Sequence, residues 1–285
     1  MRRLVIPLLV ATSLLLPLPL SAKKAKQEKA KQEKMATLFK NARTALKNQT
    51  GQDAARDALL GALSRPEMKN RQKAKVYYTA AQLEESLNGV ENRKAFLKQA
   101  YDTAKLFNKL SDMYDRLRLC DSIEQVPDAN GKVHQYYQKR AQKLRLKHSR
   151  NILSGGKFFL AKKNYAAAYP FFDHYCSVFP DSNAIRWATL SAFLSENPVG
   201  TIKYADRAIA ISESATAAVL QEYKARAYAK LGNDSAWVAS LTDGVLHYPE
   251  HDWFFVQLSD WYQAHRAFNE ERRLADDLIL RTGGK

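Results

Sequence analysis

The chain has 285 residues, a formal net charge of +16 and only two cysteines. Two cysteines are too few for a fold built from disulfides, and no apolar stretch beyond residue 20 is long enough to cross a membrane. The charge is uneven, because residues 23–157 hold 30 Lys and Arg against 14 Asp and Glu, whereas residues 158–285 hold 13 against 15. The length suits one large domain, two small domains or one extended array of repeats.

Residues 1–22, MRRLVIPLLVATSLLLPLPLSA, predict a secretory signal peptide. Two arginines precede an apolar run over residues 4–20, and Ser21 and Ala22 supply the small residues that cleavage needs. The alternative is an uncleaved anchor, but the run contains three prolines and falls short of the roughly 20 apolar residues of a spanning helix. Lysines directly after the run oppose translocation. We still expect an exported protein, periplasmic first and extracellular or envelope-associated as alternatives.

Residues 23–34, KKAKQEKAKQEK, contain the five residues AKQEK twice in tandem. They are good helix formers with no apolar stripe to bury. The segment is interpreted as a Lys-rich polar spacer, with a basic arm for an anionic surface as the functional alternative.

Residues 35–148 predict divergent helical hairpins, because apolar residues recur three and four apart and runs of strand-like alternation are absent. The first expected hairpin buries Leu38, Ala42 and Ala45 on one helix and Ala54, Ala58 and Gly61 or Ala62 on the next. Further helices are expected over about 72–88, 91–107 and 109–124 and, after a connector at Pro127 and Asn130-Gly131, over 133–150.

An offset of 69 residues relates residues 151–182 to residues 220–251. It places Gly156 on Ala225, Phe159 on Tyr228, Asn164 on Asn233, Phe172 on Leu241 and Pro180 on Pro249. One more unit lies between them, so the offset is expected to comprise repeats of 34 and 35 residues. A period in this range indicates stacked helical hairpins.

The unit over residues 149–182 resembles the tetratricopeptide repeat. It has the large, small and aromatic residues of that pattern and its closing proline at Ile152, Gly155, Gly156, Phe159, Ala168, Phe172 and Pro180. Two antiparallel helices approach closely only where one lacks bulk, and aromatic rings fill the remaining gap. Trp237 departs from the pattern, since it stands where the family has a small residue. The resemblance implies an all-α fold in which residues 149–285 form a tetratricopeptide-like α-solenoid, a right-handed superhelix of antiparallel helix hairpins.

The pentapeptide HYPEH, residues 247–251, matches the H-x-x-E-H signature of a zinc peptidase. A zinc hydrolase would use His247, Glu250 and His251, with both histidines on one face of a continuous helix. Pro249 lies between the histidines and falls where Pro180 falls in the repeat, so we expect a turn. The zinc hydrolase is the least favoured function, and we predict no catalytic residue, metal or cofactor.

Three other features are interpreted as packing. Cys120 and Cys176 are expected to be separately buried thiols, with a single disulfide as the alternative. The SGGKFF segment at 154–159 lacks the spacing of a phosphate-binding loop, so its glycines are interpreted as positions of close helix contact. Aromatic residues at helical spacing suit a core, and no nucleic-acid-binding module is present, so no nucleic-acid partner is predicted.

The resemblance implies that a partner lies in a concave groove formed by the first helices of successive units. The expected groove residues are Arg150, Lys157, Arg226, Lys230 and Trp253, with Asp260 in the last unit. Two cations 69 residues apart would suit an acidic peptide or a terminal carboxylate, while solvated charges are the simpler reading. We therefore predict a non-catalytic protein- or peptide-binding scaffold of the bacterial cell envelope. The alternative is electrostatic adhesion of the basic N-terminal half to an anionic polymer or membrane surface.

Overall fold

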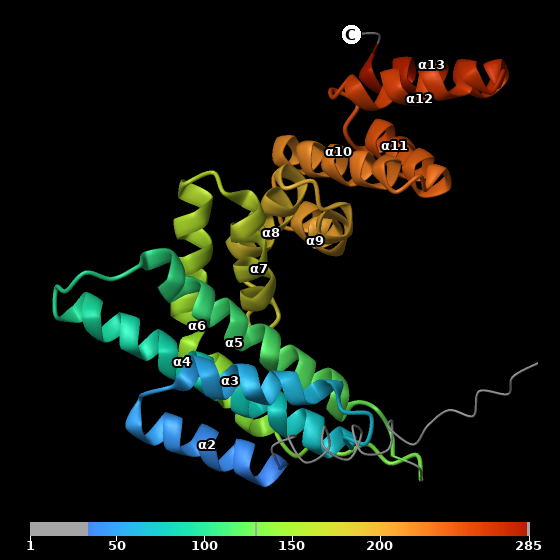
Figure 1. Cartoon of the computed structure of the whole chain (residues 1–285). Coiled ribbons are helices and arrows are strands. Elements are labelled where there is room, and N and C mark those ends of the chain that lie inside the picture. Colours follow the sequence, from blue (N-terminus) through green and yellow to red (C-terminus); the bar gives the residue numbers. More distant parts are fainter. Residues whose placement is uncertain (1–33, 129, 284–285) are drawn as a thin grey trace, which may run out of the picture.

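A computed structural model describes residues 34–128 and 130–283, which form twelve α-helices and one short 3-10 helix, with no strand in these ranges (Figure 1). The expected all-α class is confirmed. The α-helices are α2 (Met35–Asn48), α3 (Gln52–Gly61), α4 (Asn70–Phe96), α5 (Thr103–Glu124), α6 (Gln138–Ala161), α7 (Tyr165–Cys176), α8 (Ser182–Leu194), α9 (Pro198–Ala210), α10 (Ser214–Lys230), α11 (Asp234–His247), α12 (Trp253–Ala264) and α13 (Phe268–Thr282). The 3-10 helix covers Ala62–Ser64.

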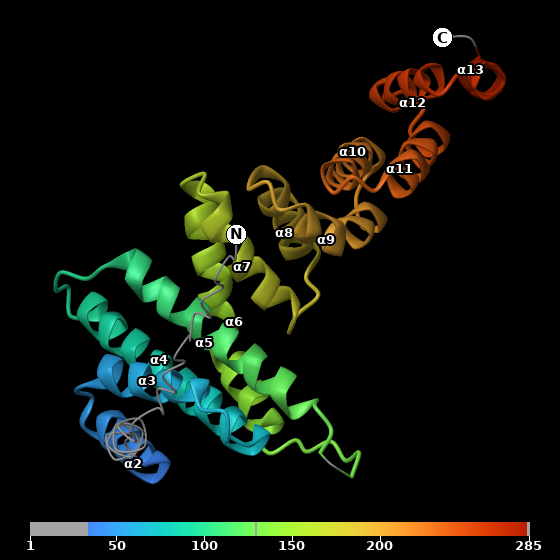
Figure 2. The ribbon, with the colours of Figure 1, turned by 45° about the vertical axis from the view of Figure 1, so that its right-hand side comes forward.

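The expected signal peptide, residues 1–22, and residues 23–33 of the expected spacer lie outside the described residues. Within the ranges that are described, no helix has the length and apolar character needed to cross a bilayer. Helices α2 to α6 form a broad block, and α7 to α13 leave it as an arm in which each helix packs against the one before it (Figures 1 and 2).

Helix α4 is longer than expected, so the three helices predicted over 72–124 are two. It continues through Gly89 to Phe96 because the polar side chains of this stretch have partners within the α4–α5 pair. The buried Asn88 amide donates a hydrogen bond to the Leu106 carbonyl at 2.8 Å, and the Glu91 carboxylate binds Lys94 at 2.8 Å. Because the hydrogen-bonding groups of this polar stretch have partners, the helix can continue through it.

The first hairpin forms as expected, but α3 buries a different face. Leu38, Ala42 and Ala45 of α2 are buried, as predicted. Ala62 is buried, as one of the two expected alternatives, but Ala54 and Ala58 are exposed, whereas Gln52 and Leu59 are buried. Burying one leucine removes more apolar area from water than burying two alanines, and the buried Gln52 amide is satisfied by the Ser86 hydroxyl.

Helix α6 joins the block to the arm. It runs without interruption through residues 148 and 149, so the boundary expected there falls inside a helix. Its first half packs on α5, where the Tyr114 hydroxyl donates to the Arg145 carbonyl at 2.6 Å. Its second half packs on α7. The divergent hairpins and the repeat-like helices therefore share one helix and one core.

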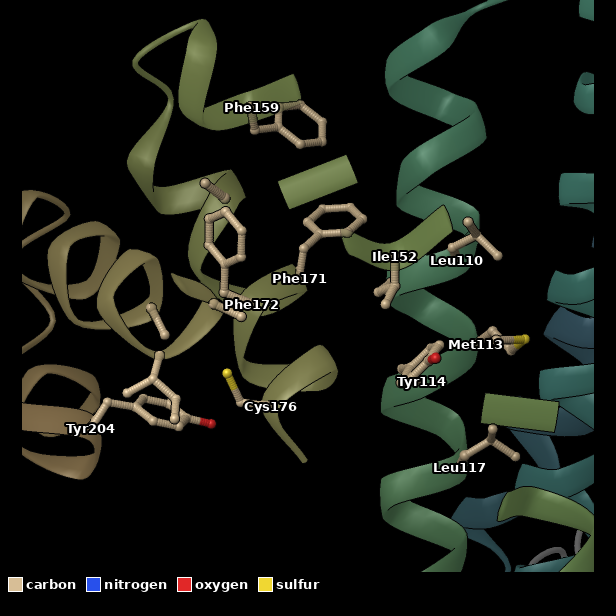
Figure 3. Close-up of a cluster of buried hydrophobic side chains, with 14 of the residues drawn as sticks. Leu110, Met113, Tyr114, Leu117, Ile152, Phe159, Phe171, Phe172, Cys176 and Tyr204 are labelled. Atoms are coloured by element: carbon tan, nitrogen blue, oxygen red, sulfur yellow. The ribbon is translucent and has the colours of Figure 1, made fainter. Parts of the chain in front are cut away.

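That core is closest packed where α6 meets α7. A Cβ atom added to Gly155 would lie 2.6 Å from the ring of Phe171 and 3.0 Å from that of Phe107, and one added to Gly156 would lie 2.8 Å from Phe172. Figure 3 shows Phe171 and Phe172 in this cluster, with α5 side chains such as Leu110 beyond Ile152. The glycines are thus positions of close helix contact, as expected.

The turns inside successive helix pairs repeat one geometry. Asn164, Asn197 and Asn233 cap α7, α9 and α11, and their side-chain oxygens accept backbone N–H groups at 2.9–3.1 Å. The residue before each cap is left-handed, at Lys163, Glu196 and Gly232. The caps lie 33 and 36 residues apart, so the 69-residue offset divides less evenly than the expected 34 and 35.

The expectation of two separately buried thiols is confirmed. Cys120 lies in α5, where its thiol contacts the Ala74 carbonyl at 3.3 Å, and Cys176 ends α7. Burial raises the pKa of both thiols to about 12, so neither is a thiolate at neutral pH.

We predict that Gly155→Val lowers the free energy of unfolding by about 1–3 kcal/mol, because the new methyl groups overlap the packed ring of Phe171. Urea denaturation measures the change. Gly89→Val is the matched control, since a Cβ at this helical glycine meets nothing within 4 Å, and it should change stability by less than about 0.5 kcal/mol. Equal effects of the two substitutions would contradict the packing account.

A second prediction concerns His174, which is buried on α7 with its ring 5.3 Å from that of Tyr114. Desolvation lowers its pKa to about 4, although Asp115 and Asp173 act in the opposite direction. The unfolded chain takes up this proton near pH 6.5, so the histidine costs stability as the pH falls from about 6.5 to 4 and nothing above that range. Comparing wild type with His174→Gln by denaturation across this range should reveal a difference that grows to about 3 kcal/mol.

The control for this prediction is His247→Gln, because His247 is exposed. Its substitution should leave the slope of stability against pH unchanged. A His174→Gln protein with the wild-type slope would show that the buried histidine is not the group responsible.

Candidate binding groove

The arm carries an open hollow of about 630 Å³ between α8 and α12. Figure 2 shows α8, α10 and α12 following one another along this part of the arm. The residues lining the hollow are Phe193, Leu194, Glu196, Asn197, Pro198, Thr201, Arg226, Ala227, Ala229, Lys230, Trp237, Trp253 and Gln257. We call this surface the α8–α12 groove.

Three of the residues expected in a concave groove, Arg226, Lys230 and Trp253, line the α8–α12 groove together. Two cations from the last turns of α10 therefore face an indole from the first turn of α12. Arg150 and Lys157 lie on α6 and do not line it, and neither does Asp260 of α12.

Lys157 and Arg226 nevertheless make matching contacts. The Arg226 guanidinium lies 4.8 Å from the centre of the Trp253 ring, and the Lys157 ammonium lies 5.0 Å from that of Trp187. Each cation comes from the first helix of one pair and covers a tryptophan from the first helix of the next pair. Such cation–π contacts favour a flat, ordered aromatic surface beside a positive charge.

Both groove cations also hold a carboxylate. Arg226 donates from Nε to Glu222 at 2.7 Å, and Lys230 donates to Glu196 at 2.8 Å. The bond from Lys230 lowers the pKa of Glu196, although both side chains remain largely exposed. Exposed ion pairs contribute only about 0–1 kcal/mol, so a carboxylate from a partner can replace Glu196 at little cost.

The pentapeptide at 247–251 is a turn, as predicted. Helix α11 ends at His247, Tyr248 leaves the helical conformation at φ −132° and ψ 58°, and α12 begins at Trp253. The His247 ring bonds the carbonyl of Asp243 in its own helix at 2.9 Å. No continuous helix presents the two histidines on one face.

His251 has a different role, because it reaches the groove network. Its Nε2 atom lies 2.8 Å from Glu222, the same carboxylate that binds Arg226. Its ring also lies 5.0 Å from that of the fully buried Phe254. The turn between α11 and α12 thus helps to fix the carboxylate that orients the groove arginine.

Sequence reasoning missed the apolar part of the groove. Phe193, Leu194 and Trp237 line it, and the Phe193 ring stacks on Tyr223 with centres 3.8 Å apart. One signal was present in the sequence, since Trp237 is large where a tetratricopeptide-like unit has a small residue. The half-buried Trp237 packs partly against the core between α10 and α12, and it also lines the groove.

Comparison with known proteins does not assign the chain to a family. The sequence matches no protein-family model and no curated protein. The tetratricopeptide resemblance and the function argued from the groove therefore rest on the chain's own spacing and geometry.

We predict that Arg226→Gln changes the free energy of unfolding by less than about 1 kcal/mol, because its ion pair and its ring contact are solvent-exposed. Arg145→Gln provides the contrast, since Arg145 is buried and pairs with the half-buried carboxylate of Asp121, and its loss should cost about 1.5–3 kcal/mol. Urea denaturation of both variants gives the comparison. A large loss from Arg226→Gln would make this arginine a structural residue.

Proposed function

We propose that this chain is a non-catalytic scaffold of the bacterial cell envelope that binds a protein or peptide in the α8–α12 groove. The observation that carries the proposal is the convergence of Arg226, Lys230, Trp237 and Trp253 on one open hollow. Tryptophan and arginine are the residues that most often dominate the binding energy of protein interfaces.

The proposal includes a tetratricopeptide-like solenoid for α6 to α13. Its support is the packing of each helix on the next, the repeated asparagine caps and the glycine–aromatic contacts between paired helices. In such arrays each repeat contacts its neighbours, and the stack leaves an extended surface for a partner.

The chemistry of the groove favours a partner with an apolar anchor beside an acidic group. The anchor would pack on Trp253 and Trp237, and the acidic group would take the place of Glu196 on Lys230. A charge-assisted bond to an already positioned lysine adds orientation to the apolar contact. This partner matches the acidic peptide expected from the sequence.

The proposal also includes export of the protein and the absence of catalytic activity. Export rests on the sequence of residues 1–22. The scaffold reading rests on the positions of His247 and His251, whose ring nitrogens contact Asp243 and Glu222.

The test is capture of envelope proteins on purified wild-type protein and on a double variant, Arg226→Glu with Trp253→Ala, followed by quantitative mass spectrometry. A partner of the groove should be depleted roughly 30-fold on the double variant, because a charge clash and the loss of an aromatic anchor together cost at least about 2 kcal/mol.

Arg207→Glu is the matched control, since it makes the same charge change at an exposed position of α9 outside the groove. It should retain the partner at the wild-type level. Equal retention on all three proteins would overturn the proposed function, and so would equal loss from both variants.

A further inference from the structure

The block holds a second hollow, of about 420 Å³, at the junction of α2, α4 and α6. Its lining consists of Phe39, Arg43, Leu46, Lys75, Tyr78, Thr79, Gln82, Tyr137 and Arg140. We call it the cationic hollow, because three of these residues are cations and none is a carboxylate.

The three cations come from three different helices. Arg43 lies on α2, Lys75 on α4 and Arg140 on α6. In the part of the chain that the structure describes, none of the three has a carboxylate within 4.0 Å. Arg43 and Arg140 are exposed, and the half-buried Lys75 has its ammonium 4.2 Å from the centre of the Phe39 ring, but all three side chains line one hollow.

Some other cations of the block are paired with carboxylates. Arg56 and Lys109 each approach the buried carboxylate of Glu84 at 3.2 Å, and Lys147 binds Glu85 at 2.6 Å. The block therefore has carboxylates to pair with its cations, but none of them lines the cationic hollow. Positive charge left unpaired around a concave surface raises the local concentration of anions.

Neutral donors complete this lining. The rings of Tyr78 and Tyr137 stack with centres 4.9 Å apart. Desolvation raises the pKa of both tyrosines, so their hydroxyl groups stay protonated and able to donate at neutral pH. Thr79 and Gln82 add a hydroxyl and an amide to the same lining.

A neighbouring hollow of about 460 Å³ shares Leu46 and Gln82 with the cationic hollow. It is rich in side-chain amides and also contains a carboxylate, two cations and a buried histidine, at Gln49, Gln82, Glu85, Asn88, Asn92, Arg93, Lys147 and His148. The Nδ1 atom of His148 has no hydrogen-bond partner among the described residues. We call this neighbour the amide hollow. Asn88 and Asn92 bond to Leu106 and to each other, so Gln49, Gln82 and the His148 ring are the groups that suit a ligand carrying several hydroxyl groups.

We propose that the cationic hollow binds a phosphate ester whose organic part is rich in hydroxyl groups. The phosphate lies among Arg43, Lys75 and Arg140, where three cations match a group with up to two negative charges. The hydroxyl groups extend toward the amide hollow. This site is separate from the α8–α12 groove, and it gives the basic half of the chain a defined ligand chemistry.

The test is isothermal titration of the purified protein at about 0.15 M ionic strength, where weak surface attraction is screened. The ligands are inorganic phosphate, glucose 6-phosphate and glucose. Saturable binding of glucose 6-phosphate, tighter than that of inorganic phosphate and absent for glucose, is the expected result. Because a lipid headgroup offers the same chemistry, sedimentation with phosphatidylcholine vesicles containing phosphatidylglycerol distinguishes a lipid source from a soluble one.

Variants make the test specific to the hollow. Arg140→Gln should weaken binding of the phosphate probe roughly tenfold, because it removes a charge-assisted bond. Lys139→Gln removes one positive charge from the neighbouring exposed position of α6, which does not line the hollow, and should leave affinity within about twofold.

Circular dichroism and the urea midpoint confirm that both variants fold as the wild type does. If Arg140→Gln fails to fold, Arg43→Gln with Lys47→Gln as its control repeats the comparison on α2, where Lys47 is exposed and outside the hollow. Equal weakening by a variant and its control would overturn the proposal, as would no saturable binding of the sugar phosphate or the vesicles.

Discussion

The arrangement of the described helices from α4 to α10 depends on the close approach of α6 to α7. Gly155 and Gly156 leave room for the rings of Phe171 and Phe172, and no side chain beyond a hydrogen fits at those two positions without displacing a ring. Because the other half of α6 packs on α5, this contact joins the block and the arm through one core that reaches from α4 to α10. Because a close-packed core is rigid, the contact between α6 and α7 also fixes the orientation of α8 and α10, which line the groove.

Charge is used differently in the two halves. In the block, burial of the Glu84 carboxylate is compensated by two cations at 3.2 Å, and three cations from different helices line the cationic hollow. In the arm, the charges are fewer and balanced, and two of its tryptophan rings are covered by cations, Trp187 by Lys157 of α6 and Trp253 by Arg226 of α10. The net charge of +16 therefore does not describe either surface on its own. The position of each cation relative to its partners decides which kind of ligand a surface favours.

The sequence was sufficient wherever one strong local signal decided the structure. The spacing of apolar residues predicted helices throughout, the paired glycines predicted close packing, and Pro249 predicted a turn at HYPEH. The sequence was not sufficient where contacts between residues distant in the chain determined the structure. Asn88 extends α4 only because α5 supplies a carbonyl for its amide, and Leu59 determines the buried face of α3. The boundary expected near residue 149 reflected where the repeat pattern begins, but a helix does not end where a pattern does.

The groove residues show the same difference between positions that the sequence predicts and positions that depend on packing. Arg226, Lys230 and Trp253 could be predicted because equivalent positions of successive units face one surface. Phe193 and Leu194 could not, because they come from the end of α8 and join the groove only through packing. The cationic hollow could not be predicted from the sequence. Its three cations, from Arg43 to Arg140, lie far apart along the chain, and no repeat relates them.

The central claim is that the α8–α12 groove is where a partner binds, and site-directed photo-crosslinking in cells tests it most directly. A benzophenone side chain is introduced at Leu194, which is 41 % exposed in the groove, or at Val219, which is 38 % exposed on α10 outside it. The account predicts a discrete crosslinked product from position 194 and none from position 219. The same product from both positions, or a product from position 219 alone, would contradict it.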